Sequence, residues 1–390
     1  MTGKYWARTA VCVWVIFLAV VCIKTIAKPL SANIYPTFAS AGSDFAAGQK
    51  LYDADHPVDH PYTDNFRYSP IVAAGFWPFS LMSWGVGGAI WRLLCAAVFL
   101  SGLWAFARRI GPSLALPGFF LLAVPLCFYS FHNGQVNPIV IGWLLWATVW
   151  AYDGKWNAAA VALAAAILMK VYPISLAGLF VLLAPVRLAV PLLLALVAGV
   201  VLPYAFQPAE YVTSQYQYWF ANLQSDDRTQ FPLWGGYQDF HMLLRVVGIE
   251  IPRQKYFAVQ GAMGLLAAAV VFRQIRLGID RRTITINAFT LGSCWMILFG
   301  TVETATFTLL APVFARELLD AKGRPRWALP VALAGAGFFL VGLIALTLPH
   351  AIHRPIIALG VQPLGALLVS IAAVGRVLAC RPTPAESPAS

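Results

Sequence analysis

The sequence predicts an all-α protein, a polytopic bundle of transmembrane helices. Of its 390 residues, 60% are hydrophobic and only 11% are charged, and the mean hydropathy is +0.72. Soluble domains carry roughly 25% charged residues, so this composition excludes a soluble globular protein. A bilayer core about 30 Å thick needs about 20 apolar residues per helical span, and such stretches recur along the whole chain.

About twelve spans are expected, within a range of ten to thirteen. The first, at about 10–26, contains Lys24 and is followed by many others, so it is interpreted as an uncleaved anchor rather than as a signal peptide. The later spans are expected at about 84–107, 113–131, 138–152, 156–171, 173–186, 188–205, 257–273, 284–300, 304–318, 328–348 and 356–379. The two short spans beside Lys170 are alternatively one broken element. These spans predict a single transmembrane domain at 1–380 and a cytoplasmic tail at 381–390.

The distribution of basic residues predicts the orientation. With a cytoplasmic N-terminus, 16 of the 27 basic residues lie in cytoplasmic segments and nine in outer segments, with Arg92 and Lys170 inside spans. Cytoplasmic loops of membrane proteins carry the excess of lysine and arginine, so both termini are expected in the cytoplasm. The protein is expected in the plasma membrane. The net charge of +11 is therefore assigned to membrane topology, and no nucleic-acid partner is expected.

Two outer segments, at about 27–83 and 206–256, are too long to be simple turns. They hold ten of the sixteen acidic residues, and the stretch 38–52 has the composition of a short interfacial helix. Transporters usually place their ionisable groups near the middle of the membrane. The sequence therefore predicts a functional site at the outer boundary between membrane and water.

Two aspartates of the first outer segment are candidates for a general base. Asp64 lies three residues before Arg67, close to the point where the chain re-enters the bilayer, and Asp44 lies in the expected interfacial helix. Partial burial raises the pKa of a carboxyl group, which suits it to accept a proton from a hydroxyl group. The alternative is that both aspartates only cap helices or pair with Lys50 and Arg67.

The stretch 53–60 contains three aspartates and two histidines, which are ligand types of a divalent-cation site. Pro57 and Pro61 prevent a regular helical presentation of these side chains. A solvated loop is therefore expected, and neither a metal nor another cofactor is predicted.

Polar side chains also stand at later outer boundaries. His132, Gln135 and Asn137 form one group, whose amides are suited to bind sugar hydroxyls or, alternatively, to satisfy the helix ends of a turn. Glu303 lies at the outer end of a span in the C-terminal half of the membrane region. Lys170, which precedes Tyr172, is flanked by apolar spans and needs an anionic partner such as a lipid phosphate, unless it reaches the interface by snorkelling.

Together these motifs resemble glycosyltransferase family 87, a branch of the GT-C superfamily of membrane glycosyltransferases. The similar segments are, in order, Gly48-Gln49-Lys50-Leu51-Tyr52-Asp53, Asp64 with Arg67-Tyr68-Ser69-Pro70, Gln135-Val136-Asn137, Lys170 with Tyr172-Pro173, and Glu303 before Thr306-Phe307. The resemblance implies a GT-C-like bundle without a nucleotide-binding domain. It also implies a polyprenyl-phosphate sugar donor, a glycolipid or glycan acceptor outside the cytoplasm, and an acidic base in the first outer loop.

One position departs from the family pattern. Family members often carry an aspartate early in this loop, and alignment on Gly48 and Leu51-Tyr52 places Asn33 near that position. An asparagine cannot act as a general base. A neighbouring acid has taken the role, the alignment shifts to Asp44, or this member is inactive.

The predicted function is therefore that of an inverting glycosyltransferase that moves a hexose, mannose-like, to an extracytoplasmic acceptor. The candidate catalytic residues are Asp44, Asp64 and Glu303, and the candidate substrate-binding residues are Arg67, Tyr68, His132, Gln135, Asn137, Lys170 and Tyr172. One rival function is a transporter or flippase for lipid-linked saccharides, which Arg92 and Lys170 inside spans would suit. The other is a non-catalytic partner in envelope assembly.

Overall fold

The computed structural model describes residues 2–52, 65–110, 116–225 and 227–381, and within these ranges every regular element is a helix. This confirms the all-α prediction. The elements are α1 (Thr2–Ala27), α2 (Tyr35–Ala46), α3 (Pro70–Ser80), α4 (Trp84–Ile110), α5 (Leu116–Asn133), α6 (Asn137–Tyr152), α7 (Trp156–Met169), α8 (Ile174–Leu183), α9 (Pro185–Val201), the 3-10 helix η2 (Leu202–Ala205), α10 (Ala209–Ser225), α11 (Phe240–Val246), α12 (Arg253–Arg276), α13 (Arg281–Phe299), the 3-10 helix η3 (Thr304–Leu310), α14 (Ala311–Leu319), α15 (Ala328–Ala345), α16 (His350–Ala358) and α17 (Val361–Ala379).

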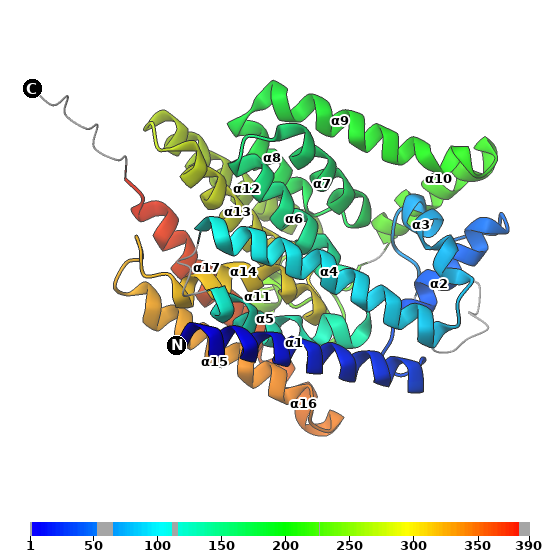
Figure 1. Cartoon of the computed structure of the whole chain (residues 1–390), viewed down its shortest axis with the longest axis horizontal. Helices are drawn as coiled ribbons and strands as arrows, with labels where there is room; N and C mark the ends of the chain where they lie inside the picture. Colours follow the sequence, from blue (N-terminus) through cyan, green and yellow to red (C-terminus); the bar gives the residue numbers. More distant parts are fainter. Residues whose placement is uncertain (1, 53–64, 111–115, 226, 382–390) are drawn as a thin grey trace, which may run out of the picture.

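Seven helical stretches in the described ranges are long and apolar enough to cross a membrane. They are Lys4–Ala27, Trp84–Ile110, Leu116–Asn133, Pro185–Ala205, Arg253–Arg276, Ala328–Ala345 and His350–Ala379. The chain is therefore a multi-pass membrane protein, but the predicted count of twelve spans is not confirmed. The start of α1 and the end of α17 lie at the same end of the molecule (Figure 1).

Two short helices lie in the region around Lys170, where the sequence is compatible with either two short spans or one broken element. The predicted spans at 156–171 and 173–186 correspond to α7 and α8, with 14 and 10 residues. At about 1.5 Å per residue, α8 is only about 15 Å long, half the thickness of a bilayer core. Lys170 ends α7 in an extended conformation (φ −147°, ψ 137°), and Pro173 precedes α8. This chain segment is thus a broken element.

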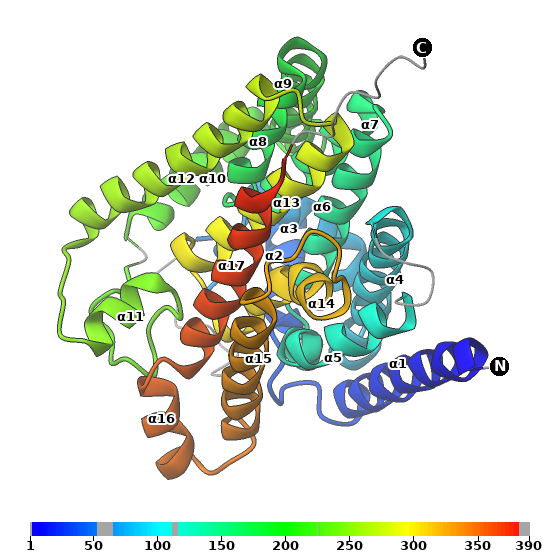
Figure 2. The same cartoon turned by 90° about the vertical axis from the view of Figure 1, so that its left-hand side faces the viewer.

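The bundle has a buried centre and a lipid-facing rim. Seen from the end where α1 begins, α13 and α6 lie inside, while α1, α12 and α15 lie at the periphery (Figure 2). Burial follows this arrangement, since α6 and α13 are buried along most of their length and α12 buries only three residues. Gly102 of α4 and Gly142 of α6 allow the two backbones to approach closely, because a Cβ at Gly102 would lie 2.8 Å from the Gly142 carbonyl oxygen.

The two long segments predicted to lie outside the membrane gather at the opposite end from the start of α1. They contain α2 and α3 in the first segment and α10 and α11 in the second, and α2, α3 and α10 lie together in Figure 1. The expected interfacial helix at 38–52 is observed as α2, which starts and ends earlier. Pro36 in its first turn suits a helix start, and the Asn33 side chain accepts a hydrogen bond from the Tyr35 amide at 3.1 Å.

Candidate active site

A polar cavity of about 350 Å³ lies at this end of the bundle, between the start of α2, the α5–α6 turn, the segment before α11 and the start of η3. Its polar and aromatic lining includes Asn33, Asn133, Gln135, Arg228, Trp234, Gln238 and Glu303. These residues come from four parts of the sequence, 270 positions apart at the extremes. The cavity therefore exists only in the folded chain.

Glu303 and Arg228 form an ion pair at the wall of this cavity. The Arg228 Nη1 atom donates to Glu303 Oε1 at 2.8 Å, and the Glu303 side chain is 40% exposed. The backbone also fixes Glu303, because it is the N-cap of η3 and forms a reciprocal capping box with Thr306. The carboxylate thus has a defined position and remains accessible from the cavity.

Lys170 lies close to this ion pair. Its Nζ atom is 6.0 Å from the ring centroid of Tyr68 and 5.6 Å from that of Tyr172, so two aromatic faces flank the ammonium group. Glu303, Arg228 and Arg67 are the charged groups whose fields act on Lys170. Three cations and one carboxylate therefore interact electrostatically in this region.

The neighbouring helices hold Arg67 and Tyr68 in place. Ser69, the N-cap of α3, donates its hydroxyl to the Leu168 carbonyl at the end of α7. From α10, the indole of Trp219 donates to the Arg67 carbonyl at 3.2 Å, and the Tyr52 hydroxyl donates to the Tyr68 carbonyl. These bonds connect the re-entry of the first outer segment to the Lys170 break.

The α5–α6 turn contributes the amides predicted from the sequence. Gln135 is 7% exposed and lines the cavity. Asn137 is 1% exposed and accepts a hydrogen bond from the Tyr172 hydroxyl at 3.2 Å, which links it to the Lys170 region. His132 is half-buried, and its ring stacks against Phe128 rather than lining the cavity.

Asn33, at the position of the departure from the family pattern, is part of the cavity wall. Its Nδ2 atom donates to the Pro29 carbonyl, and its Oδ1 atom accepts from the Tyr35 amide and from Arg92 Nη2, both at 3.1 Å. Every polar atom of this side chain is therefore engaged in holding the start of α2.

Of the two candidate aspartates, Asp44 does not line the cavity. Asp44 lies on α2 beside Tyr211 of α10, and burial together with the nearby Asp44 carboxylate raises the pKa of the Tyr211 hydroxyl above its usual range. Asp64 and the stretch 53–60 lie outside the described residues.

Arg228, Trp234 and Gln238 are among the cavity residues that were not predicted from the sequence. The only sequence signal was the dense group of aromatic residues at 206–240, which is equally typical of interfacial anchoring. Among the described residues, no group of three or more histidine, cysteine, aspartate or glutamate side chains is placed to hold a metal ion.

Comparison with known proteins gives one family, and the similar crystal structures include two of one enzyme. The chain is similar to ArnT from Cupriavidus metallidurans in the apo state, with 17% identity, a TM-score of 0.45, and coverage of 97% of this chain and 78% of that chain. For ArnT bound to undecaprenyl phosphate the identity is 17%, the TM-score 0.37, and the coverage 94% and 77%. No curated protein matches the chain significantly.

The family comparison matches the motifs of the sequence. The model of glycosyltransferase family 87 matches residues 66–301, a range that includes Arg67, Gln135, Asn137 and Lys170 and stops two residues before Glu303. This confirms the family that the motifs predicted. Because the match covers more than half of the chain, the protein belongs to glycosyltransferase family 87 and is a membrane glycosyltransferase.

Proposed function

We propose that the protein transfers a neutral, mannose-like hexose from a polyprenyl-phosphate sugar to a glycolipid or glycan acceptor on the extracytoplasmic side of the cytoplasmic membrane. The observation that carries this proposal is the cluster of Lys170, Arg67 and Arg228 around Glu303, beside a polar cavity. A phosphate needs cations, a sugar needs hydrogen-bonding groups, and the transfer needs a base.

The cations would bind the phosphate of the donor. Lys170 is flanked by apolar helices and aromatic rings, where a cation is costly without an anion. A lipid-linked phosphate approaching along the membrane boundary would supply that anion. As the phosphate departs with its negative charge, Lys170 and Arg67 would stabilise the charge where it develops.

The polar cavity would bind sugar. The Gln238 side chain is 4% exposed, and its Oε1 atom is buried and accepts no hydrogen bond from any described residue. A sugar hydroxyl would satisfy this acceptor, which otherwise costs free energy. Trp234 offers an indole that is 43% exposed and suited to stack on the apolar face of a sugar ring. The only carboxylate in the lining, Glu303, is already paired with Arg228. Such a lining favours an uncharged hexose.

Glu303 is the base that the geometry supports best. It would accept the proton of the acceptor hydroxyl, whose oxygen forms a bond to the anomeric carbon while the bond from that carbon to the phosphate oxygen breaks. The polyprenyl phosphate leaves with the electron pair of that bond. A single displacement of this kind inverts the anomeric configuration. Arg228 would hold the Glu303 carboxylate in position.

An aspartate of the first outer loop, Asp44 or Asp64, is the alternative base, as the family resemblance implies. Asp44 lies beside Tyr211, and Tyr211 lies near Tyr52. Tyr52 in turn donates a hydrogen bond to the Tyr68 carbonyl, which links Asp44 to the Lys170 region. Substituting each acid separately distinguishes the candidates. Loss of a general base typically lowers the rate by about 10²- to 10⁴-fold, whereas loss of a helix cap leaves the rate nearly unchanged.

The proposal is tested with purified protein in nanodiscs, using polyprenyl-phosphate mannose as donor and a short mannoside glycolipid as acceptor. Lys170→Met is expected to raise the donor KM and to lower kcat/KM by at least about 10²-fold, since it removes a partly buried cation from a phosphate. Lys170→Arg should retain part of the activity. Glu303→Gln should lower kcat by about 10²- to 10⁴-fold with little change in donor KM.

Lys255→Gln is the matched control, because Lys255 is an exposed lysine of the second outer segment that does not line the cavity. Unchanged transfer by Lys170→Met and Glu303→Gln, with the control also unchanged, would refute the proposed site. Full activity of Glu303→Gln together with inactive Asp44→Asn or Asp64→Asn would move the base to the first outer loop.

A further inference from the structure

A second cavity, of about 690 Å³, lies at the end of the bundle opposite to the candidate active site. It is formed by the turn between α6 and α7 and by the first turns of α9. Its lining consists of Gly154, Lys155, Trp156, Asn157, Ala158, Val186, Arg187, Val190 and Pro191. None of these residues belongs to the catalytic cluster, so this cavity needs a separate explanation.

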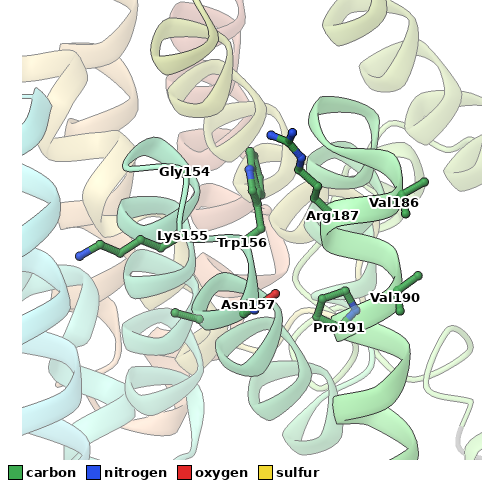
Figure 3. A pocket seen from close by; sticks show the side chains of 9 residues that line it. Gly154, Lys155, Trp156, Asn157, Val186, Arg187, Val190 and Pro191 are labelled. Carbon is green, nitrogen blue, oxygen red and sulfur yellow. The ribbon is translucent and has the colours of Figure 1, made fainter.

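Two cationic groups, those of Arg187 and Arg281, approach Trp156 at this cavity. Figure 3 shows the Arg187 guanidinium extending from α9 towards Trp156, the Asn157 side chain facing α9, and Lys155 extending to the other side. Arg281, at the start of α13, contributes the second cation beside Trp156, with its Cζ atom 5.7 Å from the Trp156 ring centroid. These two cations come from helices that are separate in the sequence.

No carboxylate neutralises these cations within the described part of the chain. The lining contains no acidic residue, and Lys155, Arg187 and Arg281 form no ion pair there. The nearby Asp153 is instead paired with Arg109 at 2.9 Å. The cavity therefore carries an excess of positive charge, which favours an anionic ligand.

The opposite wall of the cavity is apolar and exposed. Val186 is 75% exposed and Val190 is 52% exposed. Both lie at the start of Pro185–Ala205, a candidate membrane span with a mean hydropathy of 2.3, of which only 17% is buried inside the protein. The apolar wall thus continues directly into a surface suited to contact acyl chains, and a soluble anion would leave it uncovered.

Gly154 adds a constraint on the same site. Its φ of +77° favours glycine, and a Cβ at this position would lie 3.2 Å from Arg281 Nη2. The turn therefore brings its backbone against the Arg281 guanidinium, which leaves the guanidinium next to Trp156.

We propose that this cavity binds the phosphate headgroup of an anionic phospholipid, with Arg187 and Arg281 beside the phosphate and the acyl chains along Val186 and Val190 of α9. The site is independent of the transfer reaction. Its position, at the end of the bundle where α1 begins, assigns it to the membrane leaflet opposite to the catalytic cluster (Figure 1).

The test measures lipid binding to the full-length protein by native mass spectrometry, with phosphatidylglycerol and phosphatidylcholine as probes. Wild-type protein should retain phosphatidylglycerol in preference to phosphatidylcholine. Arg187→Gln/Arg281→Gln should weaken phosphatidylglycerol binding by about 30-fold, since each basic residue near an anionic headgroup contributes roughly a fivefold factor in affinity. The single variant Arg187→Gln, at an exposed position, should weaken binding by about fivefold.

The matched control is Arg273→Gln/Arg276→Gln, two exposed arginines at the end of α12 that do not line the cavity. This control should bind phosphatidylglycerol like the wild type. Three results would overturn the proposal: an equal loss in the control, no preference over phosphatidylcholine, or displacement of the lipid by millimolar inorganic phosphate. The last result would assign the cavity to a soluble anion.

Discussion

Arg92 is a fully buried arginine surrounded by neutral oxygen atoms. Its Nε atom donates to the Phe131 carbonyl at 2.8 Å, and its two terminal nitrogens donate to Gly88, His132 and Asn33. A buried charge is tolerated when hydrogen bonds replace its hydration. Arg92 therefore holds the α5–α6 turn against the start of α2. Because this structural role explains the buried charge, Arg92 gives little support to the transporter hypothesis.

Asn33 leads to a prediction about the missing family aspartate. In Asn33→Asp, the new carboxylate would contact Arg92 and lose the bond from Nδ2 to Pro29, so it would be a weak base. We expect that Asn33→Asp does not raise kcat. In the double variant Asn33→Asp/Glu303→Gln, kcat should remain about 10²-fold or more below that of the wild type. Initial rates of sugar transfer measure this. Recovery of activity in the double variant would show that Asn33 occupies the position of the base.

At the scale of helices, a network of buried charges joins α14 to α17. Arg376 Nε donates to Glu317 Oε1 at 2.9 Å, and Arg376 Nη1 lies 3.3 Å from Asp320 Oδ2, with the Arg376 and Glu317 side chains 3% and 0% exposed. Arg316 lies 3.9 Å from Asp320 and adds a second cation. Such a network fixes the relative position of two helices because neither charge is stable there alone.

Removing one charge of this network should therefore cost more than removing two. Arg376→Gln is expected to lower the free energy of unfolding by about 3–5 kcal/mol, because it leaves the Glu317 carboxylate buried without its main partner. Glu317→Gln/Arg376→Gln should recover much of that loss. Unfolding monitored in mixed micelles gives the values for a double-mutant cycle. A double variant less stable than either single variant would contradict this account.

The short helix α11 predicts a pH dependence of stability. Asp239 is its N-cap, 4% exposed, and accepts a hydrogen bond from the Met242 amide at 3.2 Å. Burial raises the pKa of Asp239 to about 7. Because the folded state holds this proton more tightly than the unfolded state, its stabilising contribution is present below about pH 4 and is lost as the pH rises to about 7.

The thermal unfolding midpoint of the wild type should fall between pH 5 and pH 7, by an amount equivalent to about 2 kcal/mol. Asp239→Asn retains an acceptor for Met242 and removes the titration, so its midpoint should change less over that range. Asp280→Asn is the control, since Asp280 caps α13 through Thr283 at an exposed position. Parallel pH profiles for the wild type and Asp239→Asn would refute the assignment.

The whole molecule has two chemically different ends. The end where α1 begins carries Lys155, Arg187 and Arg281, and the other end carries α2, α3, α10 and the catalytic cluster (Figure 1). With the excess of basic residues in the cytoplasm, both termini would lie inside and the active site outside. The predicted orientation follows from the charge distribution and from the fact that α1 begins and α17 ends at the same end of the molecule.

Reporter fusions test this orientation. Green fluorescent protein fused after residue 381 should fluoresce, since it folds in the cytoplasm, and alkaline phosphatase fused there should be inactive. Alkaline phosphatase inserted after Gln224, at the end of α10, should be active. The reverse pattern would place the catalytic cluster on the cytoplasmic side and contradict the proposed donor side.

The sequence by itself determined the fold class and the family, and it indicated part of the proposed site. The membrane bundle follows from apolar stretches of bilayer length, a one-dimensional property that burial in lipid requires. Lys170 and Glu303 were identifiable because an ionisable group at a span boundary is conspicuous in an apolar chain. The number of spans was less certain, since short helices such as α8 are recognised only from how they pack.

Only the tertiary structure decided which of these residues meet. It brings Arg228 to Glu303, 75 positions away, and it adds Gln238 and Trp234 to the cavity wall. It also assigns Asn33 a structural role beside Arg92. These pairings depend on helix packing across long sequence separations, which hydropathy and local motifs do not encode. The sequence thus identified the chemical groups, and the packing of the helices selected the cluster that they form.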